Sequence, residues 1–220
     1  MLSPEFFLKP LSLDVMHISI SKDDVNAMPP LTFPGHIHVI DSVLNLIAAV
    51  NVLKKSPVVG FDTETRPSFR RGESHKVALV QLSTLEDCFL FRVNKIGLPQ
   101  RLIEYLADAS CLKVGLSLHD DFSMLRRLNP NLKLEGFVDI QNIVGKYHIT
   151  DISLQKVYAI LFQKKISKGQ RLTNWEAPQL TPGQQNYASI DAWSCIHIYN
   201  YLNGGHFVPE KSQFIVEDEE

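Results

Sequence analysis

The chain has 220 residues, of which 45% are hydrophobic and 21% are charged, and this is the composition of an ordinary globular protein. Such a length accommodates one domain with a sizeable core. The formal net charge of −2 excludes a globally basic nucleic-acid-binding protein. Any contact with nucleic acid therefore has to come from a local basic patch or from metal ions.

Cysteine spacing and hydropathy bear on the compartment. Cys88, Cys111 and Cys195 are far apart and form neither a CxxC pair nor a zinc-binding spacing, so we expect buried thiols in a reducing compartment. No apolar run approaches the roughly 18–20 residues of a membrane span, and the N-terminus lacks a signal-peptide pattern. These features predict a cytoplasmic protein without membrane contact, and they identify no protein partner.

Composition divides the chain into three parts. Residues 1–35 have prolines scattered among polar turns and are expected to form an N-terminal extension outside the core. Residues 36–203 are the expected folded domain. Residues 204–220 begin with two glycines and end with four acidic residues, a composition that usually remains solvated, so we expect an acidic C-terminal tail.

Within the domain, the hydrophobic pattern predicts strands and helices in a definite order. Apolar runs predict strands at 57–61, 77–82, 88–91 and 111–116. Capping signals and helical periodicity predict helices that begin near 43, 99 and 120, at 154 after Ser153, and at Pro182 after Thr181. The first three strands are joined by short links and suggest an antiparallel meander. The whole is an α/β pattern, a mixed sheet covered by helices.

Two acidic residues end the first strand of this meander. Asp62 and Glu64 are two positions apart, so a strand presents both on one face. Adjacent carboxylates repel each other and are hard to keep ionised in a partly buried site unless a cation lies between them. Mg²⁺ favours such oxygen ligands. The alternative is a pair of exposed acids at a strand end, because this spacing is common by chance.

A third acid follows the strand at 111–116. Asp120 and Asp121 stand where that strand runs into a helix, and either could simply cap it. On the helix, Asp121 shares a face with Met124 and Leu125 while Asp120 points elsewhere. Asp121 is therefore the better candidate for an inward-facing carboxylate.

A tyrosine and an acid lie one helical turn apart in the last helix. Tyr187 and Asp191 are four residues apart, which places the phenol and the carboxylate on one face, where they could share a water and a metal. The alternative is a surface pair on a helix that packs through Ile190 and Ile198.

Taken in order, Asp62-x-Glu64, Gly115-x₅-Asp121-x₃-Leu125 and Tyr187-x₃-Asp191 resemble the DEDD exonuclease superfamily in its tyrosine branch, close to the ribonuclease D and Werner-syndrome exonuclease-domain group. Residues 76–83 and 172–176 resemble further segments of that group. The resemblance covers about 36–203. It implies a ribonuclease H-like fold, with a mixed five-stranded sheet flanked by helices.

The resemblance also implies an activity and a site. The activity is 3′→5′ exonucleolytic hydrolysis of DNA or RNA with two Mg²⁺ or Mn²⁺ ions, which releases nucleoside 5′-monophosphates. The implied roles are metal ligation by four acids and orientation of the attacking water by a tyrosine: Asp62, Glu64, Asp121, Asp191 and Tyr187. The position that carries histidine in the sister branch is Asn186 here.

Candidate substrate contacts surround these motifs. Those nearest the acids are Thr63, Arg66, Arg70, Arg71 and His119. A second basic cluster precedes Trp175 and consists of Lys164, Lys165, Lys168 and Arg171. Basic loops can hold a phosphate backbone, but they are also commonly solvated. Phe69 could stack on a base, whereas Trp175 is expected in the core.

Two other functions fit part of the pattern. One is a nucleic-acid-binding module of the same fold that has lost catalysis, and the presence of all four acids and the tyrosine argues against it. The other is a different ribonuclease H-like nuclease, which would not require Tyr187 four residues before Asp191.

Overall fold

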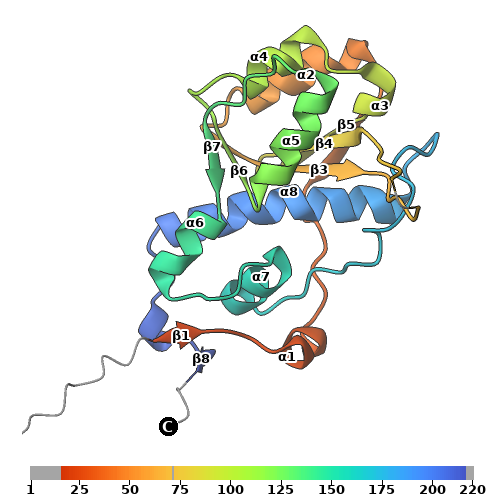
Figure 1. The fold of residues 1–220 in the computed structure, drawn as a ribbon. Helices are drawn as coiled ribbons and strands as arrows, with labels where there is room; N and C mark the ends of the chain where they lie inside the picture. Colours follow the sequence, from red (N-terminus) through yellow and green to blue (C-terminus); the bar gives the residue numbers. More distant parts are fainter. Residues whose placement is uncertain (1–15, 71, 217–220) are drawn as a thin grey trace, which may run out of the picture.

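The computed structural model of this protein describes residues 16–70 and 72–216, and its centre is a six-stranded mixed sheet in the order β2-β5-β4-β3-β6-β7 (Figure 1). The strands are β2 (His36–Ile40), β3 (Val58–Thr65), β4 (Val77–Ser83), β5 (Asp87–Phe91), β6 (Leu112–Gly115) and β7 (Phe137–Asp139). Strands β3, β4 and β5 form the expected antiparallel meander, and β2, β6 and β7 each run parallel to a neighbour. The α/β class is confirmed.

The sheet has six strands, whereas five were expected. The strands at its two edges, β2 and β7, carry few buried side chains: β2 alternates between exposed and partly buried positions, and the three residues of β7 are all half-buried. An edge strand leaves no continuous apolar run, so the pattern that reveals a central strand is missing from the sequence.

Most of the longer helices begin near their capping signals. The helices are α1 (Lys22–Ala27), α2 (Val43–Leu53), α3 (Val93–Ile96), α4 (Gln100–Leu106), α5 (Leu118–Leu128), α6 (Gln141–Val144), α7 (Leu154–Phe162) and α8 (Pro182–Asn203). Ser153 accepts a hydrogen bond from the Lys156 N–H at the start of α7, and Thr181 forms a capping box with Gln184 at the start of α8.

The sheet separates two hydrophobic cores. Helices α7 and α8 cover one face, and Figure 1 shows α8 between the sheet and α7. Helices α2 and α4 cover the other face, where Val59 and Phe61 of β3 are completely buried. Successive β3 residues thus alternate between the cores, and Gly60 and Asp62 face α8.

Gly60 lets α8 lie directly on β3. A Cβ at this position would overlap the backbone carbonyl oxygen of Ala192, which is in the middle of α8. The absence of a side chain therefore determines how near the helix comes to the strand. It also places Asp191, the neighbour of Ala192, beside the end of β3.

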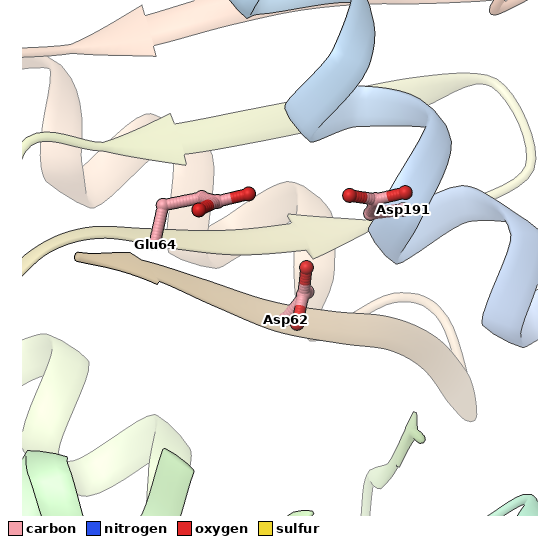
Figure 2. Close-up of side chains that lie close together, drawn as sticks. All are labelled: Asp62, Glu64 and Asp191. Carbon is pink, nitrogen blue, oxygen red and sulfur yellow. The ribbon is translucent and has the colours of Figure 1, made fainter. Parts of the chain in front are cut away.

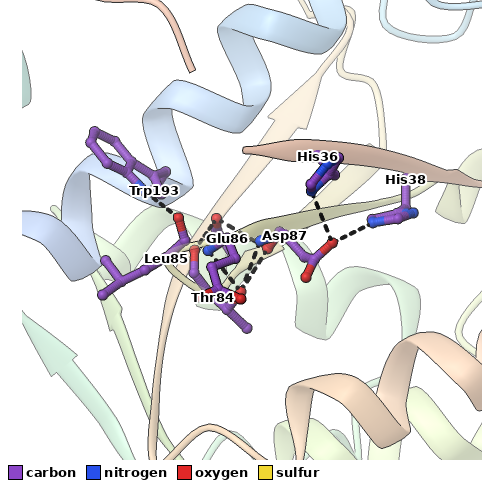
Figure 3. Close-up of polar contacts among 8 residues, drawn as sticks. His36, His38, Thr84, Leu85, Glu86, Asp87 and Trp193 are labelled. Atoms are coloured by element: carbon purple, nitrogen blue, oxygen red, sulfur yellow. Dashed lines mark hydrogen bonds and ion pairs between the residues drawn. The ribbon is translucent and has the colours of Figure 1, made fainter. Parts of the chain in front are cut away.

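The turn between β4 and β5 fixes the position of α8 along the sheet (Figure 3). The indole N–H of Trp193 donates to the Leu85 carbonyl at 3.0 Å, and the Thr84 hydroxyl oxygen accepts the Asp87 N–H at 2.9 Å. Asp87 also lies 2.6 Å from His38 Nε2 and so ties β2 to β5. Helix, turn and edge strand are held as one unit.

The described part of the expected N-terminal extension packs onto the domain. Its strand β1 (His17–Ile18) pairs with β8 (Ile215–Val216) from the expected C-terminal tail. The core takes up five of its side chains: Ile18, Ile20, Val25, Leu31 and Phe33. These apolar residues lie between prolines and polar turns, which hides their periodicity in the sequence. The domain boundaries themselves stay predictions, and residues 1–15 and 217–220 lie outside the described part of the chain.

Substitution of Gly60 by alanine is expected to lower the free energy of unfolding by about 1–3 kcal/mol, the usual cost of overpacking, because the methyl group meets backbone that cannot rotate away. Chemical denaturation monitored by circular dichroism measures the change. Gly145→Ala is the control, since a Cβ there meets no described atom within 4 Å and its φ of −59° suits alanine. Equal stability of the two variants would show that α8 does not depend on contact at Gly60.

Candidate active site

Three carboxylates meet where α8 crosses β3. One oxygen each from Asp62, Glu64 and Asp191 lies within 4.8 Å of the others. Figure 2 shows the three side chains close together at this crossing. Asp62 and Glu64 share the face of β3 that points to α8, as their spacing predicts. Asp191 is only 7% exposed. Residues far apart in the sequence thus form one compact acid cluster.

Burial and mutual repulsion shift the titration of these groups. Burial raises the pKa of Asp62 well above its usual range, and the charges of Asp121, Asp191 and Glu64 raise it further. The pKa of Glu64 is raised to about 9, by burial first and then by Asp191 and Asp121, against the opposing effect of Arg171. Burial raises the pKa of Asp191 to about 7. Such a cluster is easily ionised only with a cation beside it.

Asp121 lies next to this cluster on α5. Its carboxylate accepts a hydrogen bond from the Thr63 hydroxyl, which comes from the opposite face of β3 to Asp62. Burial raises the pKa of Asp121 to about 6, and the Thr63 hydrogen bond lowers it. Asp121 is outside the group of three that converge within 4.8 Å. Among the neighbouring charges, however, that of Asp121 contributes most to raising the pKa of Asp62. Asp121 is therefore a fourth acid beside the cluster.

The start of α5 has another cap, so Asp121 is not needed for that role. The Asp139 carboxylate, at the end of β7, accepts the backbone N–H groups of Ser117 and Leu118 at 3.1 and 2.9 Å. Asp120 and His119 face solvent, with 93% and 95% of their side chains exposed, and contact each other at 3.2 Å. His119, a candidate substrate contact, thus lies on the solvent face and outside the acid cluster.

Tyr187 adjoins the cluster from α8. The interaction of its hydroxyl with the Asp191 carboxylate lowers the pKa of that acid. Burial raises the pKa of the phenol above its ordinary value, and the nearby charges of Asp191, Glu64 and Asp62 raise it further. Behind Tyr187 lies the ring of Trp175, which is completely buried at a centroid distance of 6.0 Å, so the expected core role of Trp175 is confirmed.

A cavity of about 390 Å³ opens onto these groups. Asp62, Tyr187 and Asp191 line it, together with Lys168 and Arg171 from the second basic cluster. Little in the sequence points to the uncharged part of the lining, which includes Ser153, Leu154, Gln155 and Ile166. Ser153 has a recognisable pattern only as a helix cap, because side chains that line a cavity without charge have no distinctive spacing.

The basic loop after β3 borders a separate cavity of about 450 Å³. Arg66 lies there 3.4 Å from Glu176, so its charge is offset, while Arg70 has no acidic partner within 4.0 Å among the described residues. Phe69 is 80% exposed and Leu172 66% exposed at the same cavity. Arg71 lies outside the described residues.

Two general expectations can be compared with the described residues. Cys88, Cys111 and Cys195 are free, buried thiols, as predicted. Among residues 16–70 and 72–216, no helix has both the length and the apolar character that crossing a bilayer demands. Cytoplasmic residence stays a prediction.

The raised pKa values predict that stability falls with pH in the absence of metal. Below about pH 4 the carboxyl groups are protonated in both states; above it the unfolded state releases protons that folded Asp191 and Glu64 retain up to about pH 7 and 9. The folded state binds more protons in this window, so the free energy of unfolding declines as pH rises through it.

Thermal melting with chelator from pH 5 to 9, using Asp62→Asn and the exposed-acid control Asp23→Asn, measures this effect. We expect the melting temperature of Asp62→Asn to exceed that of wild type at pH 8 without metal, and that of Asp23→Asn to equal it. Mg²⁺ or Mn²⁺ should raise the melting temperature of wild type most at high pH. A wild-type melting temperature that rises with pH, or that does not respond to the ions, would show that the acids are not crowded.

Comparison with known proteins is consistent with this geometry. Residues 37–204 match the family model described as 3′-5′ exonuclease. Similar proteins include the bifunctional 3′-5′ exonuclease/ATP-dependent helicase WRN of Mus musculus, 31% identical over 186 residues that cover 80% of this chain and 13% of the relative. A 3′-5′ exonuclease of Arabidopsis thaliana is 31% identical over 150 residues, which cover 66% of this chain and 52% of the relative. The chain thus spans about an eighth and about half of these relatives.

Solved structures show the same fold. The Nibbler EXO domain of Aedes aegypti aligns with a TM-score of 0.71 at 22% identity, over 82% of this chain and 96% of that one. RNase D of Escherichia coli aligns with a TM-score of 0.68 at 20% identity, over 76% of this chain and 44% of that one. The expected ribonuclease H-like fold is confirmed. With the family match over most of its length, the chain belongs to the 3′-5′ exonuclease family.

Proposed function

We propose that this protein is a metal-dependent 3′→5′ exonuclease, which hydrolyses phosphodiester bonds at the 3′ end of DNA or RNA and releases nucleoside 5′-monophosphates. One observation carries the proposal: carboxylates from β3 and α8 converge within 4.8 Å, in a setting that raises their pKa values. Oxygen donors so close together suit Mg²⁺ or Mn²⁺, and few structural roles justify burying them together.

The donor set suits two ions. Asp62, Glu64 and Asp191 would hold one, and Asp62 with the neighbouring Asp121 would hold the other. Two divalent ions lower the pKa of an attacking water and stabilise charge on the attacking and leaving oxygens. The Thr63 hydroxyl positions the Asp121 carboxylate, and Asp139 fixes the start of the helix that carries it.

The remaining polar groups of the site would orient a water molecule and balance the charge of the acids. The Tyr187 phenol is protonated at neutral pH, as any phenol with a pKa at or above the usual value is, so its hydroxyl can hold a water molecule in place beside Asp191. Lys168 and Arg171 lie near enough to lower the pKa values of Asp191 and Glu64 respectively. Both cations border the cavity, where they can attract a phosphate.

Tyr187→Phe tests the orienting role. Loss of the hydroxyl alone is expected to lower kcat by about ten- to a thousandfold, the range for one positioned polar group, and to leave metal affinity unchanged. Single-turnover kinetics at saturating Mg²⁺ and calorimetric metal titration measure the two quantities. An unchanged rate of chemistry, or a loss that weaker metal binding accounts for, would contradict the role.

The neighbours Asp121 and Asp120 form a matched pair on one helix. Asp121→Asn is expected to remove nearly all activity, because a half-buried ligand beside Asp62 is lost, whereas Asp120→Asn should retain most of it, because that side chain is 93% exposed. Initial rates on a single strand in Mg²⁺ separate the two. Similar losses in both variants would mean that Asp121 does not belong to the site.

A further inference from the structure

A second cavity, of about 470 Å³, adjoins the active-site cavity. The two share four lining residues: Ser153, Gln155, Ile166 and Lys168. The Gln155 amide donates to the Ile166 carbonyl at 2.9 Å and so keeps this shared wall in place. Residues of α1 and of the start of α7, two helices that pack against each other, also line the second cavity. Figure 1 shows where these two helices lie. The second cavity therefore leads away from the acid cluster on the side of α1.

This second cavity, the lysine groove, is lined by Lys22, Lys156, Lys165 and Lys168, and no acidic side chain of the described residues lines it. Asp151 offsets Lys156 at 2.7 Å. Lys165 donates to the Asn26 carbonyl at 2.6 Å, a bond that leaves its charge uncompensated. Lys22 and Lys168 are exposed. A chain of net charge −2 thus concentrates positive charge beside its acid cluster.

The N-terminal segment that forms one wall of the lysine groove is firmly attached. The Leu31 N–H donates to the Lys165 carbonyl at 2.8 Å, and the Lys165 N–H donates to the Pro29 carbonyl at 3.0 Å. The Asp151 carboxylate accepts the Ile20 N–H at 2.9 Å. This segment precedes residue 37, where the family match begins. The groove is therefore completed by residues outside the matched region.

We propose that the lysine groove binds the phosphate backbone of the strand whose 3′ end lies at the acid cluster. Lysine ammonium groups bind phosphates as point charges without reading sequence, which suits an enzyme that removes successive nucleotides. The loop after β3 is less suited to this task, because Glu176 offsets Arg66 and the acidic Glu73 also lines its cavity. This inference rests on the proposed function, since it names the path of that substrate.

The test compares strand lengths. Lys22→Glu alone, and combined with Lys165→Gln, is expected to lower kcat/KM about tenfold on a strand of about twelve nucleotides at low salt, and to leave dinucleotide hydrolysis unchanged. The slope of log affinity against log salt should become shallower by about 0.7 for each phosphate contact removed. Lys22 is the first residue of α1, where glutamate is favourable, so the single variant should fold. Lys133→Glu is the control, an exposed lysine that lines neither cavity.

Binding measured by fluorescence anisotropy with chelator separates this inference from the proposed function. If Lys22→Glu binds the long strand more weakly than Lys133→Glu does, the result supports strand binding in the lysine groove. This holds even if wild type hydrolyses nothing, and in that case only the proposed function fails. Binding and long-strand kcat/KM equal to those of the control overturn the groove while leaving hydrolysis in place. An equal loss on the dinucleotide also overturns it, because that loss would arise at the acid cluster.

Discussion

Direct contact between α8 and β3 at Gly60 is the constraint on which the site depends. Because this position has no side chain, the backbone of Ala192 rests on the strand, and Asp191 reaches the two acids that β3 presents two and four residues later. The hydrogen bond from Trp193 to Leu85 fixes the helix along the sheet, and Phe61 anchors the strand from its other face. A displacement at this crossing would separate the carboxylates, whatever else remained folded.

The same crossing creates an electrostatic strain that a cation relieves. Burial raises the pKa values of Asp62, Glu64 and Asp191, and repulsion from neighbouring acids raises those of Asp62 and Glu64 further. The metal-free site therefore favours protonated carboxyl groups, which are poor ligands. A divalent ion held by these acids would offset their repulsion and favour their ionised form. Lys168 lowers the pKa of Asp191 and Arg171 lowers that of Glu64, and both cations line the cavity where a phosphate would arrive. Positive charge continues from there into the lysine groove.

Much of the fold and of the candidate site follows from local pattern. Period-two spacing places Asp62 and Glu64 together, the four-residue spacing in α8 places Tyr187 by Asp191, and the caps at Ser153 and Thr181 mark where α7 and α8 begin. Local patterns do not predict contacts between segments that are far apart in the sequence. Asp139 caps α5 from another strand, the edge strands β2 and β7 bury too little to show a period, and the N-terminal segment joins the core through scattered apolar residues.

The most direct test of the account follows a single strand labelled at its 5′ end during incubation with the protein and Mg²⁺. Four acids that hold two cations, with the strand leading away through the lysine groove, predict a labelled ladder that shortens from the 3′ end one nucleotide at a time and disappears when a chelator is present. Immediate release of the label as a mononucleotide, cleavage at internal positions, or degradation that persists in chelator would contradict it.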